Sequence, residues 1–222
     1  MNTRLPNITP WISLCILLFA STALAESLNI DIGTRYNALP DTYAAASGQA
    51  GFWNDDGLSF NDLVDINNIA TDVDLSYSSS IVDGWVGGTS LTNEDYLQGD
   101  NFFVFSGAWA LTLSNLDAGT YDVYYYAPGN PGVTTGAMTI NGTLVGSLTG
   151  QLGPLVQGTS WDVLTDVVVD GSNTLVIAAT GTSGARGLAG LQIVSTTAVP
   201  LPAAFWMLGG GVLAICGFCR RR

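Results

Sequence analysis

The sequence predicts an all-β protein, an antiparallel β-sandwich of the jelly-roll type, flanked by two apolar terminal segments. Short β-branched and aromatic runs recur between Gly, Asn and Asp residues, and helical periodicity is nearly absent. The 27 glycines and 8 prolines indicate many turns. The region between the terminal segments is long enough for one substantial core and has no repeat of fixed period. We therefore expect one domain over residues 26–197.

The expected strands follow from alternating or continuous apolar runs bounded by turn residues. The first alternates apolar and polar residues, as a half-buried strand does. Asn141-Gly142 is the strongest short hairpin signal in the chain, and residues 170–173 predict a second hairpin. A single helical turn is expected at residues 92–97. The strands are expected at residues 28–32, 73–77, 101–106, 109–113, 121–126, 137–140, 144–148, 163–169, 174–179 and 188–194.

Composition excludes several chemistries. The chain has 18 acidic residues, six positive residues that are all Arg, and no His, for a net charge of −12. The absence of His excludes His-based triads and ordinary zinc sites. The chain also has no Lys, which excludes Schiff-base lysines and P-loop lysines. Because binding to phosphates takes a basic surface, the charge balance also argues against nucleic acid as a partner.

Residues 1–25 have the three-part layout of a secretory signal peptide. A positive start with Arg4 precedes an apolar stretch at residues 11–20, and Ala23 and Ala25 occupy the −3 and −1 positions of a cleavage site. We expect cleavage after Ala25; the alternative is an uncleaved membrane anchor.

Residues 198–222 combine a short proline motif, one marginal span and a positive end. A helix over about residues 203–219 would extend about 25 Å, the lower limit for crossing a bilayer. The arginines would hold its end in the cytoplasm. A permanent tail anchor is the alternative. The motif is Val199, Pro200, Leu201, Pro202 and Ala203, and the chain ends with Arg220, Arg221 and Arg222.

This order of motif, span and arginine cluster resembles the PEP-CTERM sorting signal of Gram-negative bacteria, in its VPLPA variant. The resemblance implies cleavage by an exosortase-type membrane protease, followed by release or transfer to the cell surface, often in bacteria that make exopolysaccharide. The motif has no Glu, unlike the Pro-Glu-Pro form.

Three further segments resemble a galactose-binding-like jelly-roll domain of bacterial PEP-CTERM proteins. They are residues 43–54, with Gly51-Phe52-Trp53-Asn54, residues 113–124, with Asp117-Ala118-Gly119-Thr120-Tyr121, and residues 188–193. The resemblance implies a carbohydrate-binding architecture and identifies no ligand residue.

The candidate ligand-facing aromatic residues are Trp53 and Trp85, which sit in Gly- and Asp-rich stretches. Exposed aromatic rings serve as stacking platforms for sugars, whereas most aromatic residues pack in cores. Trp109 begins an alternating strand and is expected in the core. In Tyr124-Tyr125-Tyr126, Tyr125 must face the opposite side of its strand from its two neighbours.

Nothing in the sequence marks the carboxylate pair that a glycosidase needs, so we expect no enzyme. We expect no cofactor; the alternative is a structural Ca²⁺, which takes hard oxygen ligands from loop side chains. The local clusters are Asp55 with Asp56, Asp62 with Asp65, and Asp72 with Asp74. They do not identify a ligand set.

Together these features predict an exported, non-catalytic protein of the cell surface or extracellular matrix. It would pass the inner membrane, be anchored there transiently and bind polysaccharide or another envelope component. The alternative is a structural or adhesive surface protein without a sugar site.

Overall fold

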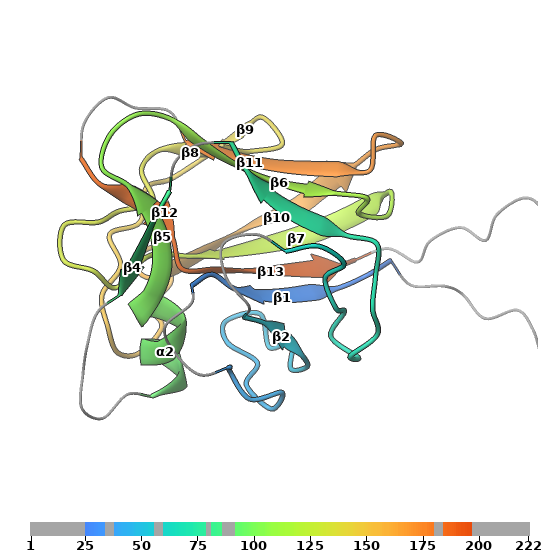
Figure 1. Cartoon of the computed structure of the whole chain (residues 1–222), viewed down its shortest axis with the longest axis horizontal. Coiled ribbons are helices and arrows are strands. Elements are labelled where there is room, and N and C mark those ends of the chain that lie inside the picture. The colour runs from blue at the N-terminus through green and yellow to red at the C-terminus, as the bar shows by residue number, and fades with distance from the viewer. Residues whose placement is uncertain are drawn as a thin grey trace, which may run out of the picture. The chain divides into compact units, whose positions relative to one another are not determined.

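In the part of the chain that the structure describes, nearly all the regular structure consists of β-strands (Figure 1). The computed structural model describes residues 25–33, 38–55, 60–78, 81–85, 92–179 and 184–196. Within these residues two five-stranded sheets and one three-stranded sheet form, together with one short helix. The expectation of a mainly antiparallel all-β fold is confirmed.

The first five-stranded sheet carries the candidate site. Its neighbours are antiparallel except β1 and β2, which run parallel. Its strands, in spatial order, are β10 (Trp161–Val169), β7 (Gly119–Tyr126), β13 (Gly190–Ser195), β1 (Leu28–Asp31) and β2 (Trp53–Asn54).

The second five-stranded sheet lies above the first in Figure 1, as in a β-sandwich. Its strands, in order, are β3 (Asp74–Tyr77), β6 (Trp109–Ser114), β11 (Thr174–Ala179), β8 (Met138–Ile140) and β9 (Thr143–Val145). The three-stranded sheet has the order β12 (Arg186–Leu188), β5 (Asp100–Val104) and β4 (Val82–Trp85).

Alternation along the strands places the core. In β6, Trp109, Leu111 and Leu113 are buried and the residues between them are half-buried. Leu175 and Ile177 of β11 are fully buried beside this strand. Trp109 is therefore a core residue, as its place in an alternating strand predicts.

One of the two expected hairpins is confirmed and the other is wrong. Asn141 and Gly142 both have positive φ values, 45° and 80°, as a two-residue turn between β8 and β9 requires. By contrast, β10 pairs with β7 and β11 pairs with β6 and β8, so the chain passes from one sheet to the other at residues 170–173. At this turn the Ser172 N–H donates to Asp170 Oδ1 and the Asn173 N–H donates to the Asp170 carbonyl. Turn bonds of this kind do not require the flanking strands to pair with each other.

The expected strand at residues 188–194 is divided between two sheets. β12 pairs with β5, whereas β13 pairs with β1 and β7. Between them, the Ala189 N–H donates to the Tyr126 carbonyl at 3.0 Å and its carbonyl accepts from Ile32 at 2.8 Å. One sequence run thus begins in the three-stranded sheet and continues in the first five-stranded sheet.

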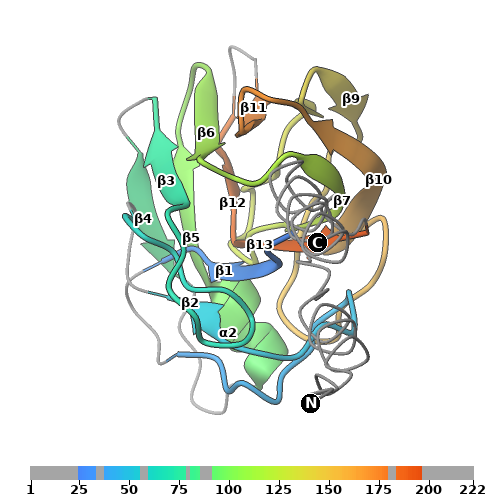
Figure 2. The same cartoon turned by 90° about the vertical axis from the view of Figure 1, so that its right-hand side faces the viewer.

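The helix α2 (Asn93–Gly99) extends the expected turn. Thr92 caps it: its hydroxyl accepts from the Asp95 N–H while the Asp95 carboxylate accepts from the Thr92 N–H. Figures 1 and 2 both show α2 directly below β5, into which it leads.

The predicted terminal segments lie outside the described residues, and so do the sorting motif, the arginine cluster and Ala23. Of the cleavage-site residues only Ala25 is described, and it is buried. In the part of the chain that the structure describes, no helix combines the length and apolar character needed to cross a membrane.

Candidate functional site

Residues 38–52, here called the covering segment, lie over the face of the first sheet that would otherwise be exposed. All four residues of β1 are buried, although the alternating pattern predicted a half-buried strand. Leu28 and Ile30 share one face, and the polar side chains of Asn29 and Asp31 share the other. The covering segment explains why this polar face is hidden.

A network of buried amides holds the covering segment in place. Gln192 of β13 is fully buried, and its Nε2 donates to Asn29 Oδ1 at 2.9 Å and to the carbonyls of Ala44 and Gln49 at 3.2 Å. The Tyr126 hydroxyl donates to Gln192 Oε1 and accepts from the Ala46 N–H. Buried polar groups are costly unless they are hydrogen-bonded, so this network specifies where the segment lies.

Trp53 belongs to this packing. Only 1% of its surface is exposed, its Nε1 donates to the Tyr43 carbonyl at 2.9 Å, and its ring stacks on Tyr43 with centroids 5.8 Å apart. The expectation that Trp53 faces a ligand is therefore wrong, because the covering segment buries its ring. The backbone of Trp85 pairs with Asp100, but its side chain lies outside the described features, so its role stays a prediction.

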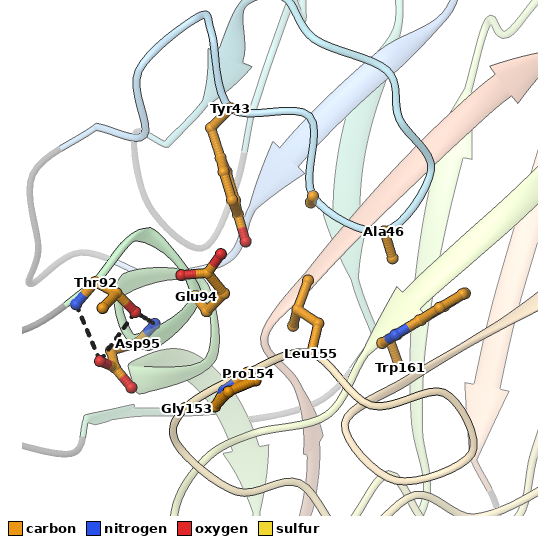
Figure 3. A pocket seen from close by; sticks show the side chains of 10 residues that line it. Tyr43, Ala46, Thr92, Glu94, Asp95, Gly153, Pro154, Leu155 and Trp161 are labelled. Atoms are coloured by element: carbon orange, nitrogen blue, oxygen red, sulfur yellow. Dashed lines mark hydrogen bonds between the residues drawn. The ribbon is translucent and has the colours of Figure 1, made fainter.

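A hollow of about 540 Å³ opens beside the covering segment, with Trp161 and Tyr43 on its walls (Figure 3). We call it the Tyr43–Trp161 hollow. Three parts of the chain line it: the covering segment, the start of α2 and the loop that precedes β10. The lining residues are Tyr43, Ala45, Ala46, Thr92, Glu94, Asp95, Gly153, Pro154, Leu155 and Trp161.

The apolar part of the hollow rests on a buried cluster. Leu39, Trp53, Leu97, Tyr126 and Ala189 form this cluster, and Tyr43, Leu155 and Trp161 pack against it while remaining partly exposed. The Trp161 ring is also braced by Tyr124 of β7, with centroids 5.9 Å apart and an interplanar angle of 27°. Trp161 is thus a supported aromatic surface at the edge of the hollow.

Gln98 joins two walls of the hollow. It is fully buried in α2, and its Nε2 donates to the Gly153 carbonyl at 2.9 Å, while its own carbonyl accepts from Gly129 at 2.7 Å. The bond to Gly153 ties the helix to the loop before β10, and the bond from Gly129 to the backbone carbonyl of Gln98 ties it to the segment after β7. Figure 3 shows Leu155 from that loop between Tyr43 and Trp161.

The polar groups of the hollow are acidic or hydroxylic. The Asp95 carboxylate is engaged in the capping box with Thr92. The Glu94 carboxylate makes no hydrogen bond within the described part of the chain, and Figure 3 shows it turned toward the Tyr43 hydroxyl. None of the described residues that line the hollow is basic.

The Tyr43 hydroxyl is a prepared hydrogen-bonding group. Its oxygen is buried and has no partner among the described residues. Burial raises the pKa of this hydroxyl above its usual range, and the negative charges of Glu94 and Asp31 raise it further. The hydroxyl therefore keeps its proton at physiological pH and can donate to a bound group.

The acidic loop residues do not form a recognisable metal site where they are described. No group of three or more Asp, Glu, Cys or His residues there could hold a metal ion. Asp65 Oδ1 accepts from the N–H groups of Asn67 and Ile69, and Asp74 Oδ1 accepts from the Asp62 N–H. Asp65 is therefore a turn-forming residue, and Asp74 links its strand to the loop at Asp62. Asp56 lies outside the described residues, and structural calcium stays a prediction.

The sequence did not single out the residues that form the hollow. Trp161 precedes the run that predicted a strand, and it gains its place from pairing with Tyr126 and stacking on Tyr124. Glu94 and Asp95 were visible only as helix-start residues. A partly exposed Trp at a strand start, after the Gly- and Pro-containing loop at residues 150–158, was the available signal.

The chain matches no protein-family model and no curated protein. Among solved structures, a family 35 carbohydrate-binding module from Clostridium thermocellum is 17% identical with a TM-score of 0.32, over 56% of this chain and 93% of that one. Another family 35 module, from an environmental isolate, is 18% identical with a TM-score of 0.30, over 57% and 91%. A peptidoglycan O-acetylesterase is 15% identical with a TM-score of 0.32, over 84% of this chain and 48% of that chain. Likenesses this weak carry no argument about the ligand or activity of this protein.

Proposed function

We propose that this protein is an exported, non-catalytic surface or matrix protein that binds polysaccharide in the Tyr43–Trp161 hollow. The observation that carries the proposal is the Trp161 ring, braced by Tyr124 and partly exposed on the wall of the hollow. Aromatic rings present an apolar face against which the C–H groups of a sugar ring can stack.

The polar groups beside this ring complete a sugar site. Ligand sites combine apolar walls with a few polar groups that fix orientation. Here the Glu94 carboxylate can accept hydrogen bonds from sugar hydroxyls and the Tyr43 hydroxyl can donate or accept one. Asp95 is held in the capping box, so the proposal assigns the hollow to binding, without a pair of carboxylates that act as acid and base.

Export and sorting rest on the sequence. Residues 1–25 would direct secretion, and residues 199–203 would direct cleavage by an exosortase-type protease before the protein reaches the surface. The protein would be membrane-anchored only between these two steps.

A glycan-array comparison of the purified full chain tests the binding site. Trp161→Ala should lower the apparent affinity for the bound glycans at least about tenfold, because it removes a stacking platform. Phe105→Ala is the matched control, since Phe105 is 68% exposed and does not line the hollow. Circular dichroism should show that both variants are folded.

Equal binding by the Trp161→Ala variant and the unmodified protein would refute this site. Failure of the unmodified protein to bind any glycan would instead favour the structural or adhesive alternative.

A further inference from the structure

We propose that the Tyr43–Trp161 hollow selects polysaccharides that carry protonated amino groups, such as partly or fully de-N-acetylated hexosamine chains. This inference rests on the proposed function and specifies its ligand. Among the described residues, the hollow brings together a carboxylate without a hydrogen-bond partner, a buried hydroxyl without a partner and two aromatic rings, and none of its described lining residues is basic.

The Glu94 carboxylate suits a cationic group. An ammonium group has three N–H donors and no acceptor, so it needs acceptors and negative charge around it. Glu94 supplies both at the N-terminal end of α2, and its neighbour Asp95 adds a second negative charge although its carboxylate is bonded to Thr92. A hydrogen bond between two charged partners is stronger than one between neutral groups.

The Tyr43 hydroxyl offers a second acceptor beside this carboxylate. Its oxygen is buried without a hydrogen bond, and such a group costs free energy until a ligand satisfies it. Figure 3 shows the hydroxyl facing Glu94. One ammonium group between them could donate to both oxygens. A neutral acetamido group in the same place has a single N–H, so it can donate to only one of the two oxygens, and it brings no positive charge to the carboxylate.

The aromatic rings and the net charge of the domain also favour a cationic ligand. Aromatic rings attract cations to their faces, and Trp is the most effective ring. All 18 acids of the chain lie in residues 26–197, against only Arg35 and Arg186, which gives this region a net charge of −16. Such a surface attracts cationic chains and repels uronate or sulfated chains.

Isothermal titration with the full chain tests the inference. The probes are a β-linked glucosamine oligomer, its fully N-acetylated counterpart of equal length and a uronic acid oligomer, at a mildly acidic pH where the amines are protonated. The unmodified protein should bind the glucosamine oligomer at least about tenfold more tightly than the N-acetylated one. Its binding to the uronic acid oligomer should be the weakest.

Two variants separate the local carboxylate from general charge. Glu94→Gln should abolish most of the preference for the amino sugar, because it should weaken binding to the glucosamine oligomer far more than binding to the N-acetylated one. Asp72→Asn removes the same charge from an exposed residue outside the hollow and should leave the preference intact. Raising the salt concentration should weaken the preference, because salt screens exposed charges.

The outcomes distinguish this inference from the proposed function. Suppose that Trp161→Ala loses binding but the unmodified protein binds the glucosamine oligomer and its N-acetylated counterpart equally. The sugar site then stands and the amino-sugar preference is overturned. An unchanged preference in Glu94→Gln, or tighter binding of the uronic acid oligomer, also overturns it. If no oligomer binds, or if Trp161→Ala binds every oligomer as the unmodified protein does, the proposed site itself fails.

Discussion

The side chain of Asp31 is an unusual occupant of a central strand. It is 4% exposed, and its Oδ1 has no hydrogen-bond partner among the described residues. Burial raises the pKa of this carboxyl well above its usual range, and the nearby charges of Asp100 and Asp55 raise it further. The folded state therefore holds a proton that the unfolded state releases at lower pH.

The consequence is a loss of stability as pH rises. Above the ordinary pKa of an aspartate, the unfolded chain binds fewer protons than the folded one, so the free energy of unfolding falls until the raised pKa is passed. Asp31→Asn should flatten this decline and raise the thermal midpoint near neutral pH, by about 2–4 °C for each kcal/mol gained. Calorimetry from acidic to neutral pH would show it; parallel pH profiles for the two proteins would contradict it.

At this scale the sequence predicted burial better than exposure. Trp109 could be assigned to the core because its own strand alternates. Trp53 could not, because the covering segment that buries it is fixed by Gln192 and Tyr126. These two residues lie 148 and 80 positions along the chain from the segment residues that they bond. The role of Trp161 was equally unpredictable, since the ring that stacks on it, Tyr124, comes from another strand.

Among the elements, strands with strong local patterns were predictable and their partners were not. The turns at residues 141–142 and 170–173 have similar residues, yet only the first joins paired strands. Which sheet a strand joins depends on its buried face, and a turn sequence does not encode that face. The strands β2 and β4 were missed because two and four residues with Asn, Asp or Gly carry almost no periodic signal.

The small sheet β12-β5-β4 depends on close backbone contact at Gly187. Gly187 lies in β12, and a Cβ built on it would lie 1.8 Å from the carbonyl oxygen of Phe102 in the paired strand β5. Gly187→Ala should therefore lower the free energy of unfolding by about 1–3 kcal/mol through overpacking.

Urea unfolding measures this effect, and Gly146→Ala is the matched control. No heavy atom lies within 4 Å of a Cβ at Gly146, so that variant should stay within about 0.5 kcal/mol of the unmodified protein. Equal stability of the two alanine variants would show that β12 can shift away from β5 at little cost.

The molecule as a whole combines high negative charge with the absence of cysteine in the folded region. Cys15, Cys216 and Cys219 all lie in the terminal segments, so no disulfide within residues 26–197 offsets the repulsion among the carboxylates. This feature could be predicted completely from the sequence, because net charge does not depend on how the strands pair. The position of each acid could not, and several of them serve local turns.

The charge predicts that added NaCl raises the thermal midpoint modestly, because salt screens exposed charges beyond a Debye length of about 10 Å at 0.1 M. A divalent ion that binds only the folded state acts differently and stabilises by mass action, by about 2.7 kcal/mol at a hundredfold excess over its dissociation constant. If a loop-Asp calcium site exists, millimolar calcium at matched ionic strength should raise the midpoint beyond the NaCl control. Scanning calorimetry of the full chain, with magnesium as a second control, measures the difference. Equal shifts in all three salts would mean that the acids form only a solvated surface, and the prediction of structural calcium would then be withdrawn.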